Sequence, residues 1–472
     1  MYKSALLPTK ARLSPTKSRF PVIKSVLLAT SAFCAGGLVP LSVQAADPLK
    51  LSLGGFAEYY MVARMQKPLN GDASGNQQKP RAFQMYWEDA EIWFSASTQL
   101  DNGVTVSYRL ELETHNDDTS GGLQPDFTTF KNSSTSRTHY RDQHQIAFTG
   151  GFGRFELGDT DGAANSMQYS SPWVTKIGVV DGTDLLMNPS FDASAVDVNQ
   201  NVGNIAGIGT KTGEFNRNNR INYFTPRFEP GFQFGVSYAP ENGSTGRGAG
   251  GPDGNAGPVQ TEEDDSDFQN ITELGVNFVR SMNGIDVAWS LTGVYAQLEE
   301  CTKFSGPGTG YEGCSSFVPN VDRYIVHNGF QISFAGWTIG AGGSVDNRGF
   351  KAGQGFSWEG NAGVTYAIGP WAVGIQGGYG EAKNDYLQNN NDDGSVVAES
   401  FSGVDTKAAV ALGGSYTLGP GIQLQAELQY INWDRRGIES PFLAALPGFA
   451  EELETHKHSQ GLAFAFGTAI SF

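Results

Sequence analysis

The end of the chain alternates between two kinds of side chain. From 462 to 472, large apolar residues occupy all but one even-numbered position, and the odd positions hold only Ala, Gly and Ser. Successive side chains of a β-strand point to opposite faces, so the pattern predicts a strand with one bulky apolar face and one small-residue face. Ending at Phe472 is typical of the closing strand of a transmembrane β-barrel. An edge strand of a soluble β-domain is the alternative.

The same alternation recurs along the chain, and two kinds of connection separate the predicted strands. Seven are tight turns, at 101–103, 149–153, 227–231, 281–284, 335–336, 369–370 and 418–421. Eight are long polar segments, at about 66–82, 115–138, 160–216, 241–267, 299–320, 347–355, 384–400 and 435–457. A membrane barrel alternates tight turns at one rim with long loops at the other. We therefore predict an all-β fold, a transmembrane antiparallel β-barrel of 16 strands with both termini at the tight-turn rim.

The first 45 residues have the features of a secretory signal peptide. Six basic residues precede an apolar segment, and small residues lead up to Ala45. Gly36, Gly37 and Pro40 interrupt the apolar run, which disfavours a retained transmembrane helix. We predict cleavage after Ala45, which leaves a single barrel domain over residues 46–472.

The charge of the chain limits its partners. The formal net charge is −17, and removing residues 1–45, with six basic and no acidic residues, makes it −23. Nucleic acid is disfavoured as a partner because its binding relies on basic surface. A strongly acidic protein instead attracts cations.

The exported chain has two cysteines and no recognisable metal-binding pattern. Cys301 and Cys314 lie in one Gly-rich stretch, and export to an oxidising compartment favours a local disulfide between them. A metal site would need further His or Cys residues nearby. The acidic stretches 262–267 and 389–394 are candidates for loop-bound calcium, with solvated loop tips as the alternative. No other cofactor is expected.

Several segments resemble a known family. They are Leu157-Gly158-Asp159 at the start of the longest connection, Leu51–Phe56, Asp101–Val106 and the terminal strand to Phe472. Over essentially the whole exported chain, these features resemble the Gram-negative general-diffusion porins. The resemblance implies a homotrimer of sixteen-stranded barrels in the bacterial outer membrane, in contact with lipid and lipopolysaccharide. It also implies that the third external loop folds into the lumen, and that small hydrophilic solutes diffuse through.

The resemblance further implies acidic residues on the inserted loop opposite basic residues on the barrel wall. Strand parity turns Arg109, Arg141 and Arg220 inward, opposite to their apolar neighbours. The alternative is that these arginines only neutralise lumenal carboxylates. A mild preference for cations is expected. The acidic candidates are Asp159, Asp161, Asp181, Asp184 and Glu214, and the basic candidates are Arg64, Arg109, Arg141 and Arg220.

Other functions fit the sequence less well. No Gly-x-Ser-x-Gly elbow is present, and most of the six histidines fall near predicted loops or strand ends, so catalysis is not expected. Trp87 and Trp93 are interpreted as interface or strand residues rather than as sugar-stacking groups. Two alternatives stay open: a channel selective for a sugar, phosphate or an amino acid on the same fold, and a soluble exported β-sheet binding module.

Overall fold

The structure is a computed structural model. It describes residues 48–68, 80–113, 143–180, 184–186, 212, 215, 218–241, 268–298, 321–349, 355–383, 386–388, 399–401, 404–436 and 456–472.

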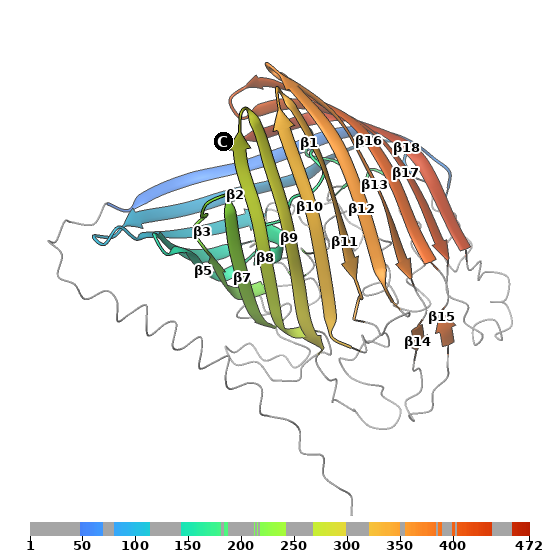
Figure 1. The fold of residues 1–472 in the computed structure, drawn as a ribbon. Coiled ribbons are helices and arrows are strands. Elements are labelled where there is room, and N and C mark those ends of the chain that lie inside the picture. The colour runs from blue at the N-terminus through green and yellow to red at the C-terminus, as the bar shows by residue number, and fades with distance from the viewer. Residues whose placement is uncertain are drawn as a thin grey trace, which may run out of the picture.

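Sixteen strands among the described residues form one closed barrel (Figure 1). Each is antiparallel to its neighbours, and β1 pairs with β18 to close the sheet. The predicted fold class and strand number are confirmed. The barrel strands are β1 (Lys50–Gln66), β2 (Phe83–Gln99), β3 (Thr105–Glu113), β4 (His144–Gly150), β5 (Gly153–Thr160), β6 (Asn218–Phe224), β7 (Phe232–Glu241), β8 (Phe268–Met282), β9 (Ile285–Leu298), β10 (Arg323–Phe334), β11 (Trp337–Asp346), β12 (Ser357–Ile368), β13 (Trp371–Lys383), β16 (Val404–Gly419), β17 (Ile422–Arg436) and β18 (His456–Ser471).

The connections follow the predicted alternation. All seven predicted tight turns join consecutive barrel strands, and the eight predicted long segments join the strands at the other rim. The connection after β13 contains a separate two-stranded sheet of β14 (Tyr386–Gln388) and β15 (Glu399–Phe401). At the tight-turn rim, Phe472 and Gly55 exchange two backbone hydrogen bonds of 3.0 and 3.1 Å. The last residue therefore takes part in closing the barrel.

Side-chain exposure confirms the two faces predicted for the terminal strand. Phe464, Phe466 and Ile470 are 41–48% exposed on the outer face, whereas Ala463 and Ala465 are at most 1% exposed. The outer face of the barrel carries many further exposed aromatic and aliphatic residues, as a lipid-facing surface requires.

Trp93, interpreted from the sequence as an interface or strand residue, lies in β2 and faces the lumen beside Arg109. It pairs with Gly54, whereas Trp87 pairs with Tyr59. Between these two pairs the β1–β2 register shifts, because β2 has an extra residue at this point. A β-bulge changes the parity of every residue beyond it. Residues of β2 on the two sides of the bulge therefore do not share a face at even spacing.

Helix is scarce in the described part of the chain. Helix α2 (Ala163–Ser166) follows β5 and is one turn long. No helix among the described residues has the length and apolar character needed to cross a membrane.

Candidate functional site

The described part of the connection between β5 and β6 lies inside the barrel, against its inner wall. Its described residues 161–180 and 184–186 are called the inserted loop below. Side chains on β7, β8, β9, β12 and β17 satisfy the loop's buried backbone N–H groups, as buried backbone requires. The bonds run from Ala163 N to Ser237 Oγ (2.6 Å), Ala164 N to Glu273 Oε2 (2.9 Å), Tyr169 N to Ser290 Oγ (2.8 Å), Ser171 N to Asn361 Oδ1 (3.1 Å), Lys176 N to Gln425 Oε1 (2.8 Å) and Leu185 N to Gln429 Oε1 (3.0 Å).

Glycines on the inner wall make room for the loop. A Cβ atom at any of these positions would come too close to a loop atom. The lane of glycines follows the loop from β8 to β16, so the backbone can lie directly on the sheet. Its members are Gly275 against Met167, Gly329 against Tyr169, Gly340 and Gly342 against Ser170, Gly363 against Pro172, and Gly413 against Trp173.

A side chain at Gly329 is therefore expected to displace the loop. In Gly329→Val, the new Cβ would overlap the carbonyl oxygen of Tyr169, at a cost of about 1–3 kcal/mol for overpacking. Because the loop can move only into the lumen, single-channel conductance should fall. Gly360→Ala is the control, since no atom lies within 4 Å of a Cβ at that position. Equal conductance in the two variants would show that the loop does not rest on Gly329.

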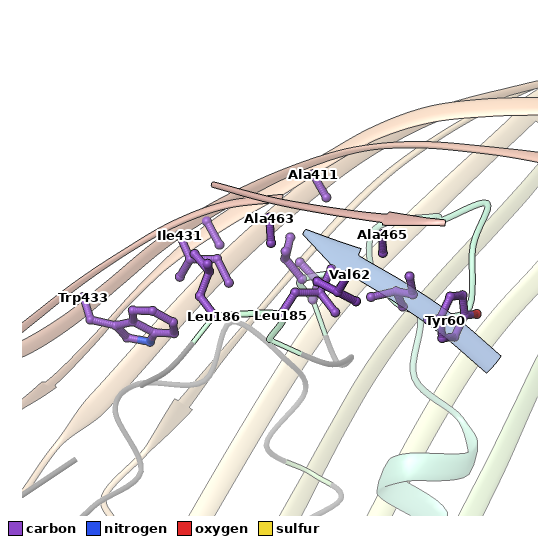
Figure 2. Close-up of a cluster of buried hydrophobic side chains, with 13 residues drawn as sticks. Tyr60, Val62, Leu185, Leu186, Ala411, Ile431, Trp433, Ala463 and Ala465 are labelled. Atoms are coloured by element: carbon purple, nitrogen blue, oxygen red, sulfur yellow. The ribbon is translucent and has the colours of Figure 1, made fainter. Parts of the chain in front are cut away.

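The far end of the inserted loop docks through an apolar cluster (Figure 2). Ile177, Val179, Val180, Leu185 and Leu186 of the loop are at most 8% exposed. They pack against inward residues of β1, β16, β17 and β18, and Figure 2 shows the leucines beside the wall. The wall residues in this cluster are Tyr60, Val62, Ala409, Ala411, Ile431, Trp433, Ala463 and Ala465. The loop thus packs against the face of β18 that carries small side chains.

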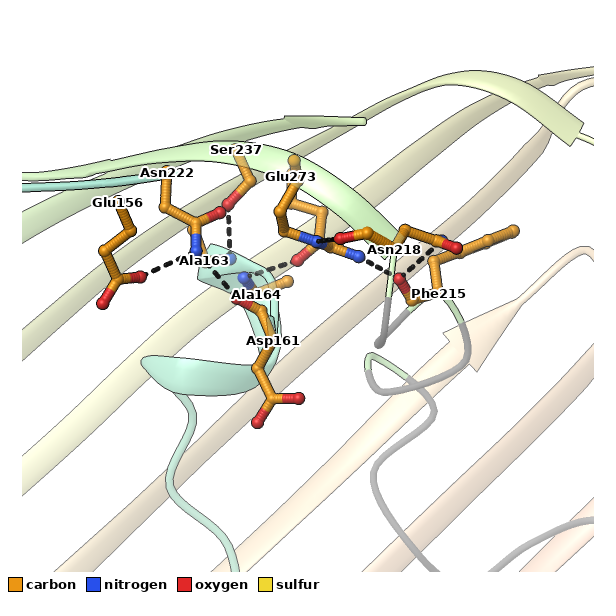
Figure 3. Close-up of polar contacts among 10 residues, drawn as sticks. Glu156, Asp161, Ala163, Ala164, Phe215, Asn218, Asn222, Ser237 and Glu273 are labelled. Carbon is orange, nitrogen blue, oxygen red and sulfur yellow. Dashed lines mark hydrogen bonds and ion pairs between the residues drawn. The ribbon is translucent and has the colours of Figure 1, made fainter. Parts of the chain in front are cut away.

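A buried ion pair fastens both ends of the connection (Figure 3). Arg220 on β6 pairs with Glu273 on β8, and both side chains are fully buried. Glu273 also accepts the hydrogen bond from Ala164 N, at the start of the loop. Arg220 donates to the carbonyl oxygen of Phe215, where the chain returns to β6. We call these four residues the loop staple.

The structure places the predicted basic residues in different settings. Arg220 points inward as expected, but its burial and its pairing with Glu273 make it part of the loop staple and not a group that lines open lumen. Arg109 pairs with Glu111 and keeps a 41% exposed side chain. Arg64 donates to the carbonyl oxygen of Leu185 and to Gln84 Oε1, the latter at 3.1 Å.

The predicted acidic residues also lie in different settings. Asp159 is 5% exposed within β5. Asp161 is half-buried, and its carbonyl oxygen accepts a bond from Asn222 at 2.9 Å. Asp184 forms an ion pair with Lys407, with an N–O distance of 2.7 Å.

Some predicted residues lie outside the described part of the chain. They are Arg141, Asp181, Glu214, Cys301, Cys314 and the acidic stretches 262–267 and 389–394. The disulfide and the calcium sites therefore stay predictions. Among the described residues, no group of three or more His, Cys, Asp or Glu side chains could hold a metal ion.

Sequence reasoning missed three functional residues. Lys407 and Glu273 were not singled out, although strand parity around Ala409, Ala411 and Gly275 turns both inward. Lys176 lies within the inserted loop, where only acidic residues were considered. The glycine lane had a visible signal too, because its members repeat at inward positions of neighbouring strands.

The comparisons with known proteins agree with this architecture. A family model described as Gram-negative porin matches residues 29–436. The chain belongs to this family. The porin is therefore an outer-membrane channel for diffusion, located in the bacterial outer membrane, and its family and fold indicate a channel rather than an enzyme.

The chain is also similar to several solved structures at low sequence identity. An anion-selective porin from Comamonas acidovorans is 13% identical, with a TM-score of 0.50, and the match covers 90% of this chain and all of the other. The channel DcaP of Acinetobacter baumannii is 11% identical, with a TM-score of 0.46 and coverage of 90% and 97%. A trimer form of OmpT from Vibrio cholerae is 10% identical, with a TM-score of 0.47 and coverage of 90% and 100%. No curated protein sequence matches this porin.

Proposed function

We propose that this porin is a passive channel for small hydrophilic solutes, and that the inserted loop sets its bore. The observation that carries the proposal is the position of the loop, which lies inside the barrel with its backbone bonded to the wall from β7 to β17. A segment fixed in this way narrows the lumen without closing it, and fixed charges beside it select among solutes. The function needs no catalytic group and no cofactor.

We propose a mild preference for cations among inorganic ions. The net charge of the chain, −17, favours cations at the mouths of the channel. On the described part of the loop, however, the carboxylate of Asp184 is neutralised by Lys407. The overall charge thus contributes more to the preference than Asp184 does.

Breaking the Asp184–Lys407 pair from either side should shift ion selectivity in opposite directions. Asp184→Asn leaves the Lys407 ammonium uncompensated and should move the reversal potential in a KCl gradient towards anions. Lys407→Gln should move it towards cations, and the double variant should stay close to the starting protein. Both shifts should shrink at high salt, because the Debye length falls from about 10 Å at 0.1 M to about 3 Å at 1 M. If neither single variant shifts the potential at low salt, this pair does not face the permeating ions.

The remaining parts of the proposal concern assembly. We propose removal of residues 1–45 on export, a homotrimer, and contact of the outer face with lipid and lipopolysaccharide. The apolar outer face supports the contact with lipid. Cross-linking of the purified protein in detergent tests the trimer, and a mass matching the monomer alone would contradict it.

A further inference from the structure

Two aromatic side chains and two cations form a connected group in the lumen. Phe56 on β1 and Trp93 on β2 have ring centroids 5.8 Å apart. The guanidinium carbon of Arg109 lies 4.6 Å from the Trp93 centroid, and Nζ of Lys176 lies 5.7 Å from the Phe56 centroid. We call these four residues the lumenal ledge.

The ledge lies inside the barrel, between the wall and the inserted loop. Phe56 has the same parity as Tyr60, whose hydroxyl donates to Gln425 Oε1 at 2.9 Å. The same oxygen accepts the backbone N–H of Lys176. Lys176 therefore extends from a bonded segment of the loop towards β1, and the ledge joins the loop to the wall on the side where β1, β2 and β3 meet.

The acidic and basic side chains around the lumenal ledge differ in their exposure to the lumen. Of the nearby carboxylates, Glu58 and Glu111 are each 4% exposed, and the half-buried Glu91 accepts the Trp93 Nε1–H bond at 2.7 Å. The cations are the exposed groups: the Arg109 side chain is 41% exposed, and Lys176 is exposed. A solute in the lumen therefore meets positive charge at the surface of the ledge.

The two cations keep unused binding capacity. Lys176 forms no ion pair with any described residue, and the Arg109 side chain stays 41% exposed although it pairs with Glu111. A guanidinium whose inner face lies on an aromatic ring can stack a second planar group on its outer face. The Lys176 ammonium lies over Phe56, the other ring of the aromatic pair, and is a compact point charge for a carboxylate.

We propose that the lumenal ledge is a binding subsite for aromatic carboxylates. The ring of the solute would stack on the exposed face of the Arg109 guanidinium, and its carboxylate would bind the ammonium of Lys176. The subsite rests on the proposed role of this porin as a solute channel. It is compatible with a mild cation preference, because two local cations hold one kind of anion while the net charge governs small ions.

The test uses the full protein and benzoate as the probe. Benzoate should reduce single-channel current in a saturable way, and cyclohexanecarboxylate, of the same charge and similar size, should reduce it much less. Lys176→Gln should raise the half-blocking benzoate concentration about tenfold, in line with the loss of one charge-assisted contact. Saturation-transfer NMR of benzoate with the detergent-solubilised protein measures binding without any conductance.

Arg154→Gln is the matched control. Arg154 is a second half-exposed arginine that pairs with an acid two residues ahead and lies 5.5 Å from a phenylalanine ring, but no described lysine lies over that ring. Its benzoate response should equal that of the starting protein. The subsite is refuted if benzoate and cyclohexanecarboxylate act alike, or if Lys176→Gln leaves benzoate binding unchanged in the NMR measurement. A protein without conductance that still binds benzoate would refute the channel and leave the subsite standing.

Discussion

Arg220→Met is expected to cost about 3–5 kcal/mol of folding free energy, because it leaves the charge of Glu273 buried without its partner. Both side chains are fully buried, so solvent cannot replace the lost interaction. The carbonyl oxygen of Phe215 also loses its donor. Reversible urea unfolding in phospholipid vesicles measures the cost. Open-channel noise should rise in the same variant, since the loop staple no longer holds either end of the connection.

A double variant separates the effect of the unpaired Glu273 charge from that of the altered packing at position 220. In Arg220→Met with Glu273→Gln, the buried charge is gone, while the Gln amide oxygen can still accept the bond from Ala164 N. Replacing both partners of a buried pair costs less than removing one. The double variant should therefore regain most of the lost stability. If it is as unstable as the single variant, packing around Met, and not the orphaned charge, is the cause.

Phe466→Arg is expected to destabilise the barrel by about 2–4 kcal/mol, the cost of a basic side chain facing lipid near the bilayer midplane. Phe466 is 41% exposed on the outer face of β18, where its neighbours are also apolar. The same vesicle-based unfolding assay measures the effect.

The depth dependence of that cost provides the control. Leu418 is also exposed on the outer side, but it lies beside the tight turn that joins β16 to β17. Leu418→Arg should cost no more than about 1 kcal/mol, because the penalty falls towards the interface. Equal costs at the two positions would mean that Phe466 is not held within the hydrocarbon region.

The strands and their connections could be predicted because each depends on local sequence. Alternation of side chains along one strand fixes which residues share a face, and the turns carry Gly, Asn and Pro at the positions where the chain reverses. The bulge in β2 shows the limit of this reasoning. A single extra residue in β2 reversed the parity, and the bulge depends on pairing with β1, which alternation within β2 does not reveal.

The lumen was less predictable because its contacts join residues far apart in the chain. Parity turned Arg220 inward correctly, but it could not show that Glu273 would pair with it under the loop. Asp184 was expected to present charge to the pore, and Lys407, more than 200 residues later, neutralises it. Strand parity shows which side chains point into the lumen. Which of them form ion pairs, and which are buried, depends on how the inserted loop crosses the strands.

The match between the inserted loop and the glycine lane also restricts how this barrel can change its circumference. Successive loop residues contact inward positions on successive strands from β8 to β16. If a hairpin between β8 and β16 were duplicated, every loop residue beyond it would face a wall position two strands away from its present partner. The backbone bonds that hold the described part of the loop run to strands from β7 to β17, so extra strands within β2–β4 would leave this alignment intact. Enlargement of this barrel during evolution is therefore expected to occur by insertion in its N-terminal quarter.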